Sequence, residues 1–178
     1  MNKKTLDLFK RVKLLLLDVD GVLTRGEIIY DDKGRELKRF NVKDGLGVVL
    51  LGKFGIKTLI VTAKDGRVVR KRAQDMRVAE VIAGVLPKES ILPAVVKKYK
   101  VKPQEICFMG DDLIDIRLIE KVGMGVAPAD AHPLVKQSAR YVTALCGGEG
   151  AVREVVDLIL HAQKLDKPLK RWVKDPTF

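Results

Sequence analysis

Short apolar runs alternate with segments of helical periodicity along most of this 178-residue chain. Four runs, at residues 12–19, 57–63, 78–84 and 105–110, are continuous enough for strands that are buried on both faces. A fifth, shorter run follows at residues 123–128. Strands that alternate with helices of about 10–15 residues favour a parallel sheet covered by helices on both faces. The pattern therefore predicts an α/β fold with a Rossmann-like parallel sheet.

A hairpin interrupts this alternation after the first strand, and a basic tail follows it. Residues 26–42 are typical of a β-hairpin inserted after the first strand, with its turn at residues 31–34. The next helix is predicted over residues 44–55, with Asp44 as N-cap and Gly55 at its end. We expect one domain over residues 1–178, with a core from about 10 to 163 and a basic tail, 164–178, that forms a flexible end rather than an ordered lid.

The composition indicates a globular protein and bears on its cellular location. Hydrophobic residues make up 47% of the chain and charged residues 32%, which is typical of a globular protein. The apolar runs are too short to span a membrane, and the charged N-terminus has no apolar stretch typical of a secretion signal. Cys107, in the apolar run at 106–110, is expected to be a buried free thiol. A reducing, cytoplasmic location is therefore predicted, with no membrane partner.

The net charge is +11, from 34 basic and 23 acidic residues. Such a balance can indicate nucleic acid, a membrane surface or an anionic small molecule as partner. The nine aromatic residues do not alternate with the basic clusters as a nucleic-acid stacking surface would require. Solvated helix faces are the favoured interpretation, attraction of an anionic substrate is the alternative, and no nucleic-acid partner is expected.

Polar residues lie at or after the ends of the first four predicted strands, where ligands bind in open parallel sheets. These residues are Asp18 and Asp20 after the first strand, Thr62 at the second, Lys88 after the third, and Asp111, Asp112 and Asp115 after the fourth. Several carboxylates at one sheet edge repel one another unless a cation offsets them. Oxygen ligands without His or Cys favour Mg²⁺. The sequence "DVDG" does not fit an EF-hand, because its glycine comes at the fourth position and no helix precedes it.

These motifs carry a family resemblance. The sequence "DVDGVLT" at 18–24 resembles the first motif of the haloacid dehalogenase superfamily, and Thr62, Lys88 and "GDDLID" at 110–115 resemble the second, third and fourth. Residues 20–48, 110–135 and 147–160 are similar to one branch, the 3-deoxy-D-manno-octulosonate 8-phosphate phosphatases. The resemblance covers the chain from residue 12 to about 163.

The resemblance implies a capless haloacid dehalogenase-type fold with the β-hairpin insertion, and a homotetramer in which the hairpins form a central barrel. It implies a Mg²⁺-dependent phosphatase that releases phosphate from a phosphorylated acidic sugar in lipopolysaccharide biosynthesis. A phosphatase of nonulosonate 9-phosphates is the alternative substrate class. A non-catalytic tetramerisation module is a further alternative, which the presence of all the catalytic motifs disfavours.

The resemblance also implies residue roles. Asp18 would be the nucleophile that forms an aspartyl-phosphate, and Asp20 the general acid and base. Asp18, Asp111 and the backbone carbonyl of Asp20 would bind Mg²⁺, and two further carboxylates would support these ligands: Asp112 and Asp115. Two residues would contact the phosphoryl group, Thr62 by a hydrogen bond and Lys88 by its charge.

Two positions concern substrate recognition. The octulosonate branch usually has Thr-Gly-Arg at the second motif, whereas this chain has Thr62-Ala63-Lys64. Lys64 keeps the positive charge but loses the planar fork of arginine that binds a carboxylate at two points. The nonulosonate branch carries an acidic residue at this position, so the octulosonate is favoured. Arg72 aligns with an arginine that reaches the substrate carboxylate of a neighbouring subunit.

Overall fold

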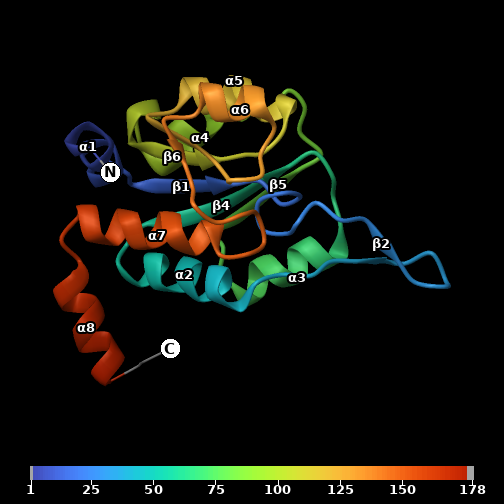
Figure 1. Cartoon of the computed structure of the whole chain (residues 1–178), viewed down its shortest axis with the longest axis horizontal. Helices are drawn as coiled ribbons and strands as arrows, with labels where there is room; N and C mark the ends of the chain where they lie inside the picture. The colour runs from blue at the N-terminus through green and yellow to red at the C-terminus, as the bar shows by residue number, and fades with distance from the viewer. Residues whose placement is uncertain (1, 176–178) are drawn as a thin grey trace.

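The computed structural model of the chain describes residues 2–175, and its centre is a six-stranded parallel sheet (Figure 1). The strand order is β5-β4-β1-β6-β7-β8, and all neighbouring pairs are parallel. The strands are β1 (Leu14–Leu17), β4 (Lys57–Thr62), β5 (Glu80–Ala83), β6 (Ile106–Met109), β7 (Met124–Ala127) and β8 (Tyr141–Val142). The parallel α/β sheet predicted from the alternating pattern is confirmed.

Helices cover both faces of the sheet. Figure 1 shows one layer that contains α2 (Val42–Lys53), α3 (Arg67–Asp75) and α7 (Ala151–Ala162). The opposite layer contains α4 (Leu92–Tyr99), α5 (Ile116–Lys121) and α6 (Pro133–Ser138). The N-terminal α1 (Lys3–Lys10) packs against α7. Three short 3₁₀ helices complete the connections: η1 (Lys88–Ile91), η2 (Pro103–Glu105) and η3 (Leu113–Asp115).

The central strand explains why its sequence is four consecutive leucines. Side chains alternate between the two faces of a strand. Accordingly, Leu15 and Leu17 belong to the hydrophobic core under α2 and α7, whereas Leu14 and Leu16 belong to the core under α4 and α5. All four are at most 1% exposed. A strand covered on both faces needs apolar residues at every position, and β1 provides them.

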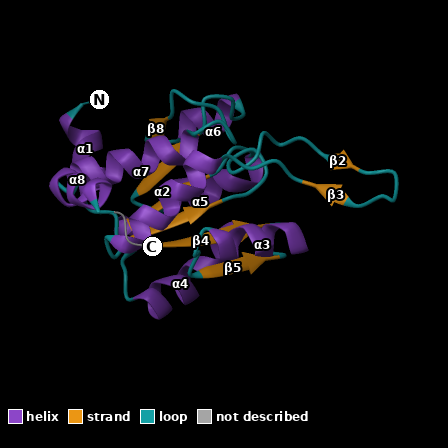
Figure 2. Cartoon of the chain, turned by 90° about the horizontal axis from the view of Figure 1, so that it is seen from below, coloured by secondary structure: helices purple, strands orange, loops and turns teal. Residues whose placement is uncertain are grey.

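The predicted hairpin is present and projects away from the sheet and its helices, as Figure 2 shows. It consists of β2 (Ile29–Tyr30) and β3 (Glu36–Leu37), which pair antiparallel with Ile29 opposite Leu37. The turn between them is closed by Asp31, whose Oδ1 accepts hydrogen bonds from the backbone N–H groups of Lys33 and Arg35.

The predicted start of α2 is wrong. The helix begins at Val42, and its N-cap is Asn41, whose Oδ1 accepts a hydrogen bond from the Lys43 N–H over 2.8 Å. Asp44 lies inside the helix, is buried, and accepts a hydrogen bond from the Arg153 N–H at the start of α7. Asp44 therefore joins α2 to α7, a contact across 109 residues that local capping rules do not predict.

The expectation of a flexible tail is also wrong for most of its length. Residues Asp166–Lys174 form helix α8, and Leu165 and Leu169 pack against the hydrophobic core. Pro168 lies in the first turn, where a missing backbone N–H costs the helix no hydrogen bond. Residues 176–178 of the tail lie outside the described part of the chain. None of the helices described over residues 2–175 is long and apolar enough to cross a membrane.

Candidate active site

A cavity of about 260 Å³ opens at the carboxyl ends of β1, β4 and β6. It contains all the motif residues predicted to converge there except Asp115, which lies buried directly behind it. The lining residues are Asp18, Asp20, Gly26, Ile28, Thr62, Ala63, Lys64, Lys88, Asp111, Asp112 and Ile114. Residues more than ninety positions apart therefore share one site, because parallel strands bring their carboxyl ends to the same edge.

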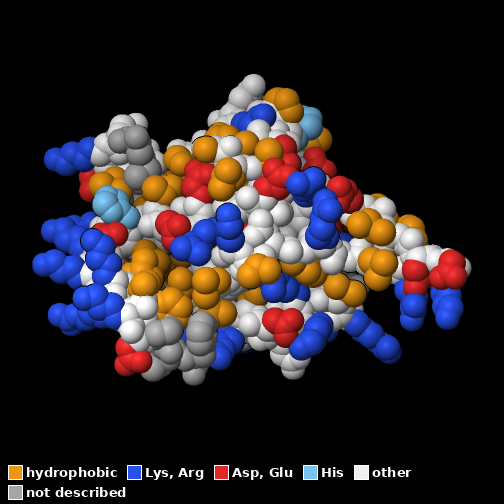
Figure 3. All heavy atoms as spheres, turned by 60° about the horizontal axis from the view of Figure 1, so that its bottom comes forward, with side chains coloured by type: hydrophobic (Ala, Val, Ile, Leu, Met, Phe, Trp, Pro, Cys, Tyr) orange, Lys and Arg blue, Asp and Glu red, His pale blue; other side chains and the backbone are white. Residues whose placement is uncertain are grey.

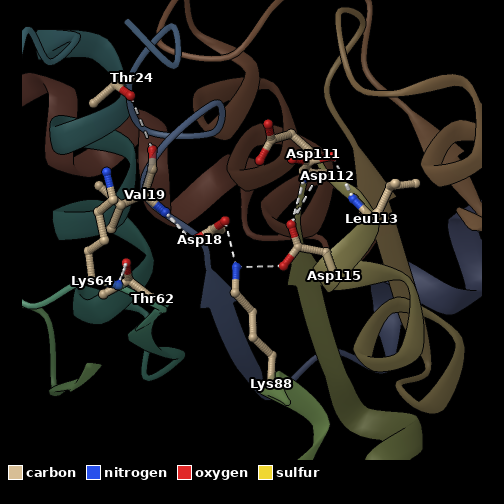
Figure 4. A network of polar contacts seen from close by, with 10 residues as sticks. All are labelled: Asp18, Val19, Thr24, Thr62, Lys64, Lys88, Asp111, Asp112, Leu113 and Asp115. Carbon is tan, nitrogen blue, oxygen red and sulfur yellow. Dashed lines mark hydrogen bonds and ion pairs between the residues drawn. The ribbon is translucent and has the colours of Figure 1, made fainter. Parts of the chain in front are cut away.

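A buried lysine joins two of the carboxylates (Figure 4). Lys88 Nζ lies 2.6 Å from Asp18 Oδ2 and 2.6 Å from Asp115 Oδ1, and its side chain is 0% exposed. Asp18 directly follows β1, and its Oδ1 accepts a hydrogen bond from the Val19 N–H over 2.7 Å. A lysine in the protein interior is stable only when its charge is paired, and here it is paired twice.

Asp115 organises the loop after β6. Its Oδ2 accepts hydrogen bonds from the backbone N–H groups of Asp111 and Asp112, at 3.1 and 3.2 Å. Asp112 in turn caps η3, because its Oδ1 accepts a hydrogen bond from the Leu113 N–H over 2.7 Å. Both side chains thus fix the backbone that carries Asp111.

The acidic residues fit a magnesium ion. Asp18, Asp111 and Asp115 each offer an oxygen, and these oxygens all lie within 4.8 Å of one another. Asp115 is already bound to Lys88 and two amides, whereas Asp111 Oδ1 is buried and has no hydrogen-bond partner within residues 2–175. A buried carboxylate oxygen without a partner is costly unless a cation binds it, and oxygen-only ligands suit Mg²⁺.

The electrostatics of the site agree with this assignment. Burial, together with the charge of Asp115, raises the pKa of Asp18 to about 6, although Lys88 opposes the shift. Burial and the charges of Asp18, Asp115 and Asp112 raise the pKa of Asp111 to about 7. A bound divalent cation would offset the repulsion that causes part of both shifts.

Gly21 leaves room for the Asp111 carboxylate. Its φ is +78°, in the left-handed region, and a Cβ at this position would overlap the carboxylate oxygens of Asp111. Gly34, at the hairpin tip, has a similar φ of +72° but open space around a Cβ. Alanine at either position would strain the backbone, but only alanine at Gly21 would also displace Asp111.

We expect Gly21→Ala to weaken Mg²⁺ binding by about 10-fold or more, because Asp111 must move, and to cost about 1 kcal/mol of folding free energy through φ strain. Gly34→Ala should lose a similar folding free energy with unchanged Mg²⁺ affinity. Isothermal titration with Mg²⁺ and thermal unfolding measure the two quantities. Equal Mg²⁺ affinity in both variants would contradict the assigned position of Asp111.

Thr62 and Lys64 line the opposite wall of the cavity. Thr62 is the last residue of β4 and is buried, and its Oγ1 accepts a hydrogen bond from the Lys64 N–H over 3.2 Å (Figure 4). The hydroxyl proton of Thr62 thus remains available for donation to a ligand. Both residues were predicted from the second motif, and the structure places both beside Asp18.

Arg72 lies elsewhere. Its Nη2 donates a hydrogen bond to the Asn41 carbonyl over 2.8 Å, and its guanidinium lies 5.4 Å from the centroid of the Phe40 ring. Among the described residues, it is not one that lines the cavity of its own subunit. Its predicted contact with a substrate carboxylate in a neighbouring subunit stays a prediction.

Lys38 was not anticipated from the sequence. It directly follows β3, and its Nζ lies 2.5 Å from Asp20 Oδ1 and 2.9 Å from Glu36 Oε1. No local pattern distinguishes Lys38 from the other 33 basic residues of this chain. Its position depends on the hairpin folding back onto the loop after β1, which is a tertiary contact.

Comparisons with known proteins agree with the geometry. The family model of the haloacid dehalogenase-like hydrolases matches residues 58–154. The 3-deoxy-D-manno-octulosonate 8-phosphate phosphatase of Escherichia coli K12 is 43% identical over 159 residues, which cover 89% of this chain and 85% of the relative.

Solved structures show the same relationship. The Moraxella catarrhalis 3-deoxy-D-manno-octulosonate 8-phosphate phosphatase, in complex with a magnesium ion, a phosphate ion and a KDO molecule, is 34% identical, with a TM-score of 0.93 and coverage of 97% of this chain and 99% of that one. A Vibrio cholerae structure, described as a putative phosphatase of the same kind, is 40% identical, with a TM-score of 0.89 and coverage of 92% of both chains. The chain therefore belongs to the haloacid dehalogenase-like hydrolases, in the family of the 3-deoxy-D-manno-octulosonate 8-phosphate phosphatases.

Proposed function

We propose that this protein is a Mg²⁺-dependent phosphatase that hydrolyses 3-deoxy-D-manno-octulosonate 8-phosphate to the free sugar acid and phosphate. The observation that carries the proposal is the cavity in which Asp18 lies between Lys88 and the acidic loop that holds Asp111. The similarity to octulosonate 8-phosphate phosphatases over 85% or more of their length supports the same substrate.

In the first step, a carboxylate oxygen of Asp18 attacks phosphorus while the bond from phosphorus to the sugar oxygen breaks. Asp20, on the wall of the same cavity, donates its proton to the departing sugar oxygen. The products are the sugar alcohol and an aspartyl-phosphate on Asp18. Two hydrogen-bond donors, Thr62 and Lys88, line the cavity and stabilise the negative charge on the transferring group.

In the second step, Asp20 accepts a proton from water as the water oxygen attacks phosphorus. The bond from phosphorus to Asp18 then breaks, which releases inorganic phosphate and restores the Asp18 carboxylate. Lys88 has the same task in both steps, because its contact with Asp18 keeps a positive charge beside the carboxylate that forms and loses the bond.

Asp18, Asp111 and the backbone carbonyl of Asp20 would hold the magnesium ion, with Asp112 and Asp115 fixing the Asp111 loop. When bound, the ion offsets the charge of the phosphoryl oxygens and of the surrounding carboxylates.

Phosphate release from a panel of sugar phosphates, with and without Mg²⁺, tests the proposal. We expect turnover of octulosonate 8-phosphate that requires Mg²⁺ and exceeds turnover of nonulosonate 9-phosphates and simple hexose phosphates. Preferred turnover of a nonulosonate 9-phosphate would assign the alternative substrate, and no turnover of either would overturn the proposal. The proposed ligands of the sugar carboxylate are Lys64, which lines the cavity, and Arg72, which would reach the substrate bound in a neighbouring subunit.

The hairpin supports a homotetramer as the functional assembly. Ile28, Tyr30 and Leu37 are 60%, 64% and 50% exposed, and Figure 3 shows hydrophobic side chains gathered along the projecting hairpin. Exposed apolar surface of this kind marks an interface. Light scattering should give the mass of four chains.

A cytoplasmic location is part of this proposal and accords with the free thiols of Cys107 and Cys146.

The raised carboxyl pKa values predict how Mg²⁺ changes stability with pH. In the metal-free protein, Asp18 and Asp111 keep protons up to about pH 6 and 7, whereas unfolded aspartates lose them near pH 4. The stabilisation from these protons is complete below about pH 4 and is lost as the pH rises through 6 and 7.

Mg²⁺ needs the deprotonated carboxylates, so its effect has the opposite sign. We expect the increase in melting temperature caused by Mg²⁺ to grow between pH 5.5 and pH 8, with about 2.7 kcal/mol of stabilisation at 100 times its dissociation constant. Differential scanning calorimetry at fixed ionic strength measures it, with Asp32→Asn, in the exposed turn, as the control. A Mg²⁺ effect independent of pH would contradict the carboxylate site.

A further inference from the structure

The loop after β1 and the β-hairpin are joined at one point by an ion pair. Lys38 Nζ lies 2.5 Å from Asp20 Oδ1 and 2.9 Å from Glu36 Oε1. The Lys38 side chain is 5% exposed, although its neighbour Leu37 is 50% exposed. The hairpin thus buries a charged side chain, which is costly unless the charge is paired, and here Asp20 and Glu36 pair it.

Asp20 needs support because of where it lies. Its side chain is 37% exposed at the wall of the cavity, so packing restrains its rotamer less than it restrains that of a fully buried side chain. Within residues 2–175, Lys38 is the hydrogen-bond partner that the structure gives to the Asp20 carboxylate. The pair occupies Oδ1, and the second oxygen, Oδ2, is left to exchange a proton with the substrate oxygen.

Lys38 does not line the cavity in the described part of the chain, whereas Asp20 does. Its link to the cavity is the contact with Asp20, so its effect on the reaction passes through that carboxylate. We propose that Lys38 is the positioning residue of the reaction: it holds Asp20 in the orientation in which the acid reaches the departing sugar oxygen and, later, the attacking water.

This inference rests on the proposed function and adds a residue from the hairpin to the catalytic apparatus. In the step it affects, the bond from phosphorus to the sugar oxygen breaks, and the proton moves from Asp20 to that oxygen. Lys38 keeps its own proton throughout, and its contribution is orientation and a positive charge beside the carboxylate that forms.

Substrates with different leaving groups distinguish a positioning role of Lys38 from a purely structural one. A sugar alkoxide needs its proton as the bond breaks, whereas p-nitrophenolate leaves without one. We expect Lys38→Met to lower kcat for octulosonate 8-phosphate about 100-fold, with KM changed less than about 3-fold. The burst of p-nitrophenolate, which reports formation of the aspartyl-phosphate, should slow less than about 5-fold.

Two further variants make the test specific. Lys38→Arg, which keeps the charge, should recover most of the lost kcat, and Lys33→Met, in the exposed turn of the same hairpin, should match the wild type. In an Asp20→Asn background, Lys38→Met should cause no further loss, because both changes remove the same function. Circular dichroism and thermal unfolding establish that each variant is folded.

Equal losses for both substrates, or losses that multiply with those of Asp20→Asn, would overturn the proposal and leave Lys38 as a structural anchor of the hairpin. If Lys38→Met did not fold, Lys38→Gln carries the same comparison, and Lys38→Arg remains the variant that keeps the charge. A different natural substrate would be a separate failure, since any alkyl phosphate that the wild type turns over can replace octulosonate 8-phosphate as the poor leaving group.

Discussion

Asp18→Asn is expected to lower kcat for octulosonate 8-phosphate by about 10⁴-fold or more, because the amide cannot form an aspartyl-phosphate. The fold should remain, since asparagine has the shape of aspartate and Lys88 keeps its 2.6 Å contact with Asp115. Phosphate release under single-turnover conditions measures the loss, and thermal unfolding checks the fold.

Asp32→Asn is the matched control for Asp18→Asn, because Asp32 lies in the exposed turn of the hairpin, away from the cavity. It should leave kcat within about 2-fold of the wild type, as surface substitutions usually have small effects. Substantial turnover by a folded Asp18→Asn protein would show that another residue is the nucleophile.

Lys88→Met has the second largest expected effect, and it concerns both stability and catalysis. The change leaves the carboxylates of Asp18 and Asp115 buried without the cation between them, which should cost about 3–5 kcal/mol of folding free energy. Loss of a charge aimed at the transferring phosphoryl group should also lower kcat by about 10²–10³-fold.

Chemical denaturation measures the first effect and steady-state kinetics the second. Lys97→Met, on the exposed face of α4, is the control and should change neither quantity measurably. If Lys88→Met were as stable as Lys97→Met in the absence of Mg²⁺, the buried ion pairs of Lys88 would not hold the site together.

The sequence predicted which residues share the cavity, because they lie at or after the ends of strands that could be recognised as parallel. Asp18, Thr62 and Asp111 lie at or just after the ends of β1, β4 and β6, and in a parallel sheet such positions share one edge. Lys88 was predicted at the same edge from its place after β5. The continuous apolar runs sufficed for this, because strands buried on both faces have few alternatives.

The features that the sequence did not predict depend on contacts between distant segments. Asp44 resembles a helix cap locally, but its partner is the N–H of Arg153. Lys38 becomes recognisable only when the hairpin lies against the loop that carries Asp20. In the tail, Pro168 and the basic residues indicated flexibility. The structure instead has helix α8 there, stabilised by the packing of Leu165 and Leu169 against the core.

In the proposed reaction, Asp18 takes the phosphoryl group from octulosonate 8-phosphate. Rapid acid quench of the enzyme during turnover with Mg²⁺ and this substrate, followed by peptide mass mapping, tests it most directly. We expect one added phosphoryl group on the peptide that contains Asp18, located on that residue, and none in Asp18→Asn. A phosphoryl group on another side chain, or turnover without any phosphorylated residue, would contradict it.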